Sequence, residues 1–245
     1  MDPRGRVALI TGGARIGRTV AEDLARRGCH VALTYRASRA SAEAAAAGVR
    51  QHGARALTIE ADLSDARSPE RIVESVRREL GGLDILICMA SIYGRTPFEG
   101  LDEAAWRSSL DTDLRSVYLL ALQAVPLMKA RGAGRIITFV DWLPASRRPR
   151  YHGRLPYYVA KAGLVGLTES LALELAPTVL VNAIAPGPVL RPPGLGEEAD
   201  REVIRATPLG RWGGAEEVAR TVIFLIETEF ITGECIRVDG GRHLS

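Results

Sequence analysis

Residues 7–17 read Val-Ala-Leu-Ile-Thr-Gly-Gly-Ala-Arg-Ile-Gly, a short apolar run that leads directly into a glycine-rich turn. A stretch with the alanine, leucine and arginine content of a helix follows from about residue 16. In such a strand–turn–helix unit the glycines let the backbone approach a pyrophosphate, and the helix N-terminus faces its charge. The stretch therefore predicts a dinucleotide-binding unit in which Gly12, Arg15, Ile16 and Gly17 contact the cofactor.

The same alternation of strand and helix continues along the chain. Apolar, β-branched runs predict strands at 7–10, 31–33, 56–59, 85–88, 136–140, 179–184 and 235–238. Helical periodicity lies between them, at 16–27, 39–51, 69–80, 103–130, 157–176 and 215–227. Because the strands are apolar throughout, both faces of the sheet are expected to be covered. We predict one α/β domain over residues 1–245, a Rossmann-type doubly wound fold with a seven-stranded parallel sheet and helices on both faces. A Pro- and Gly-rich segment at about 186–205 is its candidate substrate loop.

Composition narrows the classes of function. The 245 residues carry a net charge of only +3, and the basic residues are scattered, so no nucleic-acid partner is expected. No apolar run is long enough for a membrane span or a signal peptide, which predicts a cytoplasmic protein without membrane partners. The three cysteines are far apart and the four histidines are dispersed, which favours reduced thiols and argues against a metal site.

The end of the second predicted strand distinguishes between dinucleotides. An acidic residue there would bind a ribose 2′-hydroxyl, but the sequence reads Thr34-Tyr35-Arg36-Ala37-Ser38. Arg36, assisted by Arg15, is suited to a 2′-phosphate, since a guanidinium makes two charge-assisted hydrogen bonds to it. Tyr35, Arg36 and Ser38 are therefore assigned to the cofactor site, and NADP (NADPH) is predicted in preference to NAD.

Tyr157 and Lys161 are four residues apart at the predicted start of a helix, so their side chains share one helix face. An ammonium near a phenol favours the phenolate and is expected to lower the pKa of Tyr157. Such a tyrosine is a candidate general acid and base. Taken alone, the pattern also fits two residues that merely share a face.

In order along the chain, the Thr11-Gly12 turn, Asp62-Leu63, Tyr157 to Lys161 and Pro186-Gly187 resemble the short-chain dehydrogenase/reductase family. The resemblance spans essentially the whole chain. It implies that Tyr157 is the catalytic acid and base and that Lys161 holds the nicotinamide ribose. It also implies a homodimer or homotetramer, with small-molecule substrates. By the same resemblance Asp62 and Leu63 face the adenine, and the nicotinamide is flanked by Pro186, Gly187 and Val189.

Two positions look like the pteridine reductase branch of that family. Asp141 follows the fifth predicted strand, where the family usually has a serine, and Cys88-Met89-Ala90-Ser91 replaces its Asn-Asn-Ala-Gly. Ala90 and Ser91 are thereby added to the cofactor site. An aspartate beside the tyrosine can relay a proton to a ring nitrogen if burial raises its pKa. Asp141 is therefore a candidate catalytic residue; its alternative interpretation is a cap on a nearby turn.

Three features depart from the family pattern. The glycine turn is one residue shorter, and Asp113 stands where the family's relay asparagine is expected, so Asp113 is included among the catalytic candidates. The segment between Asp141 and Tyr157 is three residues longer than in the pteridine reductases. It carries four arginines, which either attract an anionic substrate or form a solvated basic loop, at Arg147, Arg148, Arg150 and Arg154. Candidates for a flat aromatic pocket, or for core, are Trp142, Tyr151, Tyr158, Met89 and Phe98.

The sequence leads to one main hypothesis and two alternatives. The main one is an NADPH-dependent oxidoreductase that transfers hydride to a C=N or C=O bond, with a pteridine-like substrate as a candidate and Tyr157 as the acid and base. The first alternative is a 3-oxoacyl or other carbonyl reductase of the same family. The second is an NADP-binding sensor or partner protein that has lost turnover.

Overall fold

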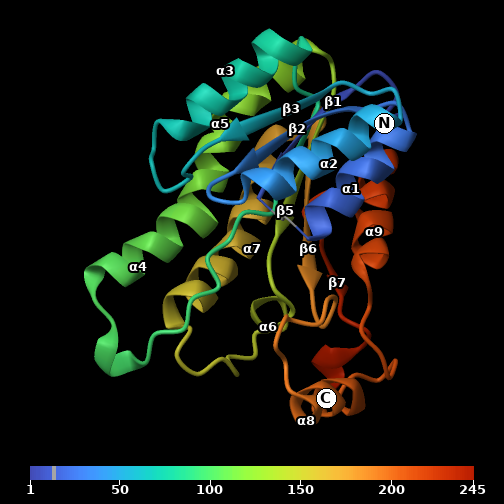
Figure 1. The fold of residues 1–245 in the computed structure, drawn as a ribbon. Helices are drawn as coiled ribbons and strands as arrows, with labels where there is room; N and C mark the ends of the chain where they lie inside the picture. Colours follow the sequence, from blue (N-terminus) through green and yellow to red (C-terminus); the bar gives the residue numbers. More distant parts are fainter. Residues whose placement is uncertain (13–14) are drawn as a thin grey trace.

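The computed structural model describes residues 1–12 and 15–245, which form a parallel sheet between two layers of helices (Figure 1). The sheet order is β3-β2-β1-β4-β5-β6-β7, and every neighbouring pair is parallel. This confirms the predicted Rossmann-type fold. The strands are β1 (Val7–Thr11), β2 (His30–Tyr35), β3 (Ala56–Glu60), β4 (Ile85–Cys88), β5 (Gly134–Phe139), β6 (Val179–Pro186) and β7 (Cys235–Val238).

Two hydrophobic cores hold the layers to the sheet. On one face α1 (Ile16–Arg26), α2 (Arg39–Gln51) and α9 (Ala215–Glu227) pack over residues such as Ile10 and Ile87. On the other face α3 (Ser68–Leu80), α5 (Ser116–Ala130) and α7 (Leu155–Leu175) pack over Leu9 and Leu86. Successive strand residues point to opposite faces, so a strand that is apolar at every position serves both cores.

The remaining short elements gather toward the carboxyl ends of the strands. They are η1 (Phe98–Gly100), α4 (Glu103–Leu110), α6 (Trp142–Ala145), α8 (Glu197–Arg205) and η3 (Arg242–Leu244). In Figure 1 this edge is at the bottom, with α6 and α8 below the sheet. None of the described helices is both long and apolar enough to cross a membrane.

Two predicted elements differ from the structure. The helix expected over 103–130 is divided by a π-helical turn, η2 (Asp111–Arg115), between α4 and α5. The candidate substrate loop at 186–205 is irregular only in its first part, because α8 begins at Glu197. Glu197, Glu198 and Asp200 lie in the first turn of α8, where negative charge stabilises a helix.

Candidate active site

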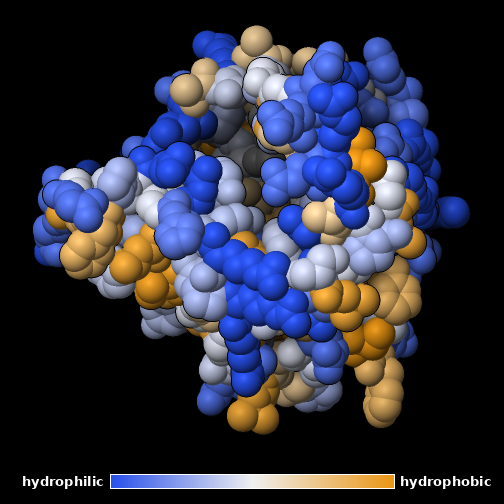
Figure 2. All heavy atoms as spheres, turned by 90° about the horizontal axis from the view of Figure 1, so that it is seen from below, coloured by the Kyte–Doolittle hydropathy of each residue, from blue (hydrophilic) through white to orange (hydrophobic). Residues whose placement is uncertain are grey.

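A cleft of about 670 Å³ lies at the carboxyl edge of the sheet, where β1 and β4 are neighbours and the order of the strands reverses. In doubly wound folds, dinucleotides bind at this reversal. Seen from this edge, the surface is hollowed and hydrophilic residues surround the opening (Figure 2). The structure brings all the predicted cofactor residues except Lys161 to the cleft wall: Gly12, Arg15, Ile16, Gly17, Tyr35, Arg36, Ser38, Asp62, Leu63, Ala90, Ser91, Pro186, Gly187 and Val189.

The glycine turn brings its backbone close to the segment after β4. Gly12 has a φ of +64°, and a Cβ on it would lie 2.6 Å from the Cα of Ala90. Glycine is therefore required there both for backbone conformation and for space. Helix α1 starts at Ile16, so its free N–H groups lie at the cleft. Gly13 and Ala14, also part of the predicted turn, are outside the described residues.

The polar side chains predicted to bind the adenosine half of the cofactor have distinct environments. Arg36 is exposed directly after β2. The Arg15 guanidinium donates to the carbonyl oxygen of Arg191 at 2.7 Å and so links the glycine turn to the segment after β6. Asp62 accepts from the N–H and hydroxyl of Ser64, at 2.9 and 2.8 Å, and these bonds lower the pKa of its carboxyl.

Asp141 and Tyr157 lie in direct contact. The phenol of Tyr157 donates to Oδ2 of Asp141 at 2.8 Å, and both side chains are buried. Oδ1 of Asp141 accepts from the N–H of Leu143 at 2.9 Å, which caps helix α6. Asp141 therefore caps a turn, as its alternative interpretation expected, and it also contacts the tyrosine; its catalytic role stays a prediction. The longer segment between the two residues does not separate them.

The protonation of this pair differs from the sequence-based expectation. Burial raises the pKa of the Asp141 carboxyl, although the hydrogen bonds from Leu143 and Tyr157 oppose this. Burial, and then the neighbouring Asp141 carboxylate, also raise the pKa of Tyr157. The prediction that Lys161 lowers the pKa of Tyr157 is therefore wrong for the protein without cofactor. The Lys161 Nζ lies 5.9 Å from the centre of the Tyr157 ring and donates instead to the carbonyl oxygen of Phe139 at 2.7 Å.

Lys161 and Asp113 form the buried side of the site. Lys161 is 2% exposed, and burial lowers its pKa while Asp113 and Asp141 oppose that shift. Asp113 is in the π-helical turn η2 and is fully buried; its Oδ1 accepts from the N–H of Ile92 at 2.9 Å. Its Oδ2 has no hydrogen-bond partner among the described residues. Burial raises the pKa of Asp113, and the Lys161 charge opposes the shift.

Two further tyrosines surround Tyr157 that the sequence analysis did not place in the catalytic group. The hydroxyl of Tyr151 donates to the Asp141 carboxylate, at 3.2 Å from Oδ2 and 3.4 Å from Oδ1. The rings of Tyr93 and Tyr157 meet edge to face, with centroids 4.9 Å apart. Tyr151 was noted only as a pocket aromatic, and no local spacing relates it or Tyr93 to Asp141.

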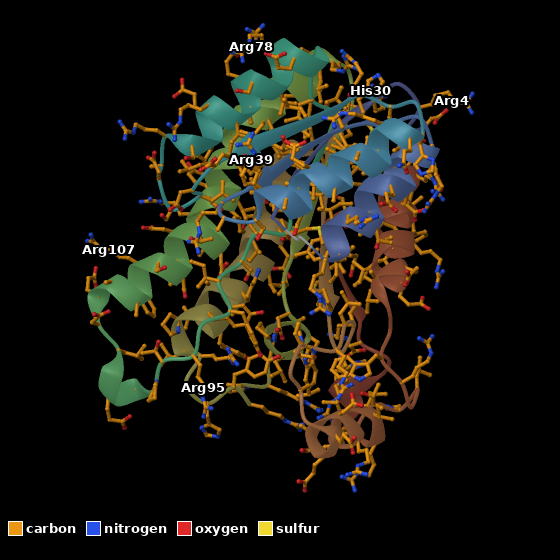
Figure 3. The ribbon with its side chains drawn as sticks, in the orientation of Figure 1. Arg4, His30, Arg39, Arg78, Arg95 and Arg107 are labelled. Atoms are coloured by element: carbon orange, nitrogen blue, oxygen red, sulfur yellow. The ribbon has the colours of Figure 1, made fainter. Side chains whose placement is uncertain are left out.

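Three of the four arginines between Asp141 and Tyr157 donate to backbone oxygens, although Arg147, Arg148 and Arg150 are exposed. Arg148 donates to the carbonyl oxygen of His243, and Arg150 donates to that of Ser245. Arg154 donates to the carbonyl oxygen of Tyr93. The exposure of this segment agrees with its interpretation as a solvated basic loop, and the contacts with backbone oxygens are an addition to that interpretation. By contrast, the side chain of Arg95 points away from the body of the protein, from the segment that follows β4 (Figure 3).

The histidines are spread over the molecule, and Figure 3 shows His30 near the edge opposite the cleft. Among the ion pairs of the described residues, one involves a histidine: Nδ1 of His243 lies 2.7 Å from Oδ2 of Asp239. No group of three or more His, Cys, Asp or Glu side chains in the described part of the chain is placed to hold a metal ion.

Comparisons with known proteins agree over nearly the whole chain. A family model described as enoyl-(acyl carrier protein) reductase matches residues 13–243. The 3-oxoacyl-(acyl-carrier-protein) reductase FabG of Staphylococcus aureus is 34% identical, over 97% of this chain and 98% of its own. The solved short-chain dehydrogenase/reductase of Serratia marcescens has a TM-score of 0.89 and 35% identity, covering 99% and 100% of the two chains. The FolM alternative dihydrofolate reductase 1 of Brucella canis, solved with NADP, has a TM-score of 0.88 and 32% identity, covering 98% and 95%.

Proposed function

The chain belongs to the short-chain dehydrogenase/reductase family, and from that membership we propose that it is an NADP(H)-dependent reductase of a polarised double bond, with Tyr157 as its proton donor. The observation that carries the proposal is the buried hydrogen bond of 2.8 Å from Tyr157 to Asp141, which lies two residues after Phe139, a residue that lines the cleft that suits a dinucleotide. A phenol held by a buried carboxyl is a group that gives and regains one proton at a fixed place.

The cleft residues suit NADP(H). The close approach of Gly12 to Ala90 and the N-terminus of α1 leave room and partial positive charge for a pyrophosphate. Arg36 after β2 would hold a 2′-phosphate, and Lys161 would hold the nicotinamide ribose. When bound, this cofactor supplies the hydride. The FolM structure, which contains NADP, supports the same assignment.

The residues of the chain itself handle the proton. Tyr157 must release its hydrogen bond to Oδ2 of Asp141 before its phenolic proton can reach a substrate oxygen or nitrogen. Asp141 can then carry a proton, because its pKa is raised by burial. Lys161, held at the carbonyl oxygen of Phe139, places a positive charge on the same side of the site, and this charge stabilises negative charge that develops on the tyrosine oxygen.

Of the two substrate classes, we propose carbonyl reduction first, with a 3-oxoacyl thioester as the leading candidate. The 34% identity to FabG over nearly the whole of both chains supports this assignment. A second class, a C=N bond in a pteridine-like ring, is favoured by one observation: a carboxyl stands beside Tyr157, at the end of β5. A carboxyl with a raised pKa can donate a proton to a ring nitrogen.

A substrate panel with NADPH separates these proposals. A 3-oxoacyl thioester, a simple cyclic ketone and a dihydropteridine are each mixed with NADPH, and cofactor oxidation is followed by its near-ultraviolet absorbance. Tyr157→Phe is expected to lower turnover by about 10²-fold or more, the usual contribution of general acid catalysis. Full activity of this variant would refute the role of Tyr157. A thermal shift with NADPH and no oxidation with any substrate would support a sensor that has lost turnover.

We also propose that the protein is a homodimer or homotetramer. Val117 and Leu120 of α5 and Leu164 of α7 are buried inside one chain, so these three side chains do not form the contact. Other apolar side chains of the same helices are exposed, and a second copy of the chain is the proposed partner that covers them: Tyr118, Leu122, Val159 and Leu173. Sedimentation velocity measures the mass; a monomer at micromolar concentration would contradict this proposal.

A further inference from the structure

Asp141 is shared by two phenols, and only one of them belongs to the Tyr157–Lys161 motif. Tyr157 donates to Oδ2 at 2.8 Å, while the hydroxyl of Tyr151 lies 3.2 Å from Oδ2 and 3.4 Å from Oδ1. The N–H of Leu143 takes the remaining direction at Oδ1. The carboxyl group is thus surrounded by three donors at a site that is only 8% exposed.

The Tyr151 ring is held in place by its surroundings. Tyr93 meets the Tyr151 ring edge to face at 5.8 Å and the Tyr157 ring at 4.9 Å, so one side chain contacts both phenols. Arg154 fixes Tyr93 in turn, because its guanidinium lies 3.6 Å from the centre of that ring and donates to the carbonyl oxygens of Tyr93 and Gly94. These contacts hold Tyr151 through its ring, independently of its hydroxyl.

We propose that Tyr151 is a positioning residue, which holds the Asp141 carboxylate through its hydroxyl and so sets the proton exchange between Asp141 and Tyr157. A phenol donates one hydrogen bond, and a carboxylate that receives two phenolic donors is stabilised in its charged form. If Tyr157 gives its proton to a substrate, its hydrogen bond to Asp141 is lost in that form. Tyr151 then remains as the side-chain donor that keeps Asp141 oriented.

Other charged and titratable groups act on the same carboxyl. Tyr157, Tyr158 and Lys161 face it from α7, and Tyr151 faces it from the preceding segment. Asp113 of η2 acts on Lys161, and Tyr93 acts on both phenols. Arg242 of η3 lies over the ring of the adjacent Trp142, with its Cζ 5.6 Å from the ring centre. A test must therefore remove the Tyr151 hydroxyl alone and leave this environment unchanged.

The test is Tyr151→Phe, which keeps the ring and its contact with Tyr93. The Asp141 carboxyl is titrated by carbon NMR of protein labelled at the aspartate side chains, without cofactor, and its signal is assigned with Asp141→Asn. The expected result is an upward shift of the Asp141 titration by about one pH unit, since a donor to the charged form is lost. An unchanged midpoint overturns the proposal. Phe230→Leu is the control, because Phe230 is a fully exposed aromatic side chain.

A kinetic test rests on the proposed reductase function. The midpoint of the kcat/KM pH profile that reports Asp141 is expected to move to higher pH by about one unit in Tyr151→Phe. The direction is the same whether the protonated or the ionised form of Asp141 is active. In an Asp141→Asn background the same Tyr151→Phe change should have no further effect. Equal effects in both backgrounds would overturn the proposal. Because the NMR titration needs no turnover, an inactive wild type refutes the function and leaves the role of Tyr151 tested by the titration.

Discussion

Replacing Asp113 by Asn tests the electrostatics of the buried side of the site. Asp113 is fully buried; Oδ1 accepts from the N–H of Ile92, and Oδ2 has no hydrogen-bond partner among the described residues. Asn has nearly the same shape and keeps an acceptor for Ile92, but it carries no charge. The substitution therefore removes the buried charge and changes the packing little.

The sign of the effect follows from the pKa of Asp113, which burial raises in the folded protein. A carboxyl whose folded pKa is raised contributes stability at pH values below its unfolded pKa, and that contribution is lost as the pH rises through the folded pKa. At a pH above the folded pKa of Asp113, the wild type carries the cost of the buried charge. Each unit by which the folded pKa exceeds the unfolded value corresponds to about 1.4 kcal/mol. We expect Asp113→Asn to raise the free energy of unfolding at pH 7 by about this amount, or about 2–4 °C in Tm for each kcal/mol.

The assay is urea unfolding followed by tryptophan fluorescence, at pH 7 and at acidic pH, with one fixed protein concentration. The advantage of the variant should shrink toward acidic pH, where wild-type Asp113 is protonated. Asp111→Asn is the matched control: Asp111 is in the same π-helical turn but is partly exposed and pairs with Arg115 at 3.3 Å, so its effect should be below about 1 kcal/mol. A variant that is less stable than the wild type at pH 7 would refute the reasoning, since the attraction between Asp113 and Lys161 would then outweigh the cost of burial.

Three further substitutions test the cleft and the sheet. Arg36→Ala should raise the KM for NADPH by about 10- to 100-fold and leave the KM for NADH nearly unchanged, because only NADPH carries a 2′-phosphate. Steady-state kinetics with both cofactors test this, and an equal rise of the two KM values would contradict it. Asp84→Ala should lower the free energy of unfolding, measured in urea, by about 3 kcal/mol. The reason is that Asp84 is fully buried and accepts hydrogen bonds from the N–H of Val7 and from Arg6 and Arg131. A loss below about 1 kcal/mol would contradict this prediction. Gly187→Ala should weaken the thermal shift given by NADPH, because its Cβ would lie 2.8 Å from the Cα of Asp239, whereas Gly196→Ala, with open space around it, should not.

Much of the cleft was predictable because its residues follow strands. In a parallel sheet the carboxyl ends of neighbouring strands meet at one edge, so the order of strands and turns places Gly12, Arg36 and Gly187 around one cavity. The helix at α8 and the π-helical turn at η2 were not predicted. Helix α8 is short and directly follows a Pro- and Gly-rich segment, so the composition of the whole segment predicts a loop. The helical periodicity continues through η2, so it does not distinguish a π-helical turn from the α-helices on either side.

The protonation of the site was not predictable from spacing. Tyr157 and Lys161 share a helix face as expected, but the Lys161 ammonium binds the carbonyl oxygen of Phe139 and the phenol binds Asp141. The pKa of Tyr157 rises as a result of burial and of a carboxylate sixteen positions away in the sequence. A sequence position does not state how much water reaches a side chain or which distant charge lies beside it.

The sequence by itself determined the alternating fold, the glycine turn that begins it and the pairing of Tyr157 with Lys161 on one helix face, because each depends on local composition or on the period of a strand or helix. Only the tertiary structure decided that Asp141 reaches Tyr157, that Tyr151 shares its carboxyl, and that Asp113 is buried with an oxygen that has no partner within 1–12 and 15–245. Those properties arise where β5, η2 and α7 pack together, and packing between distant segments sets the solvent exclusion and the charges that a side chain meets.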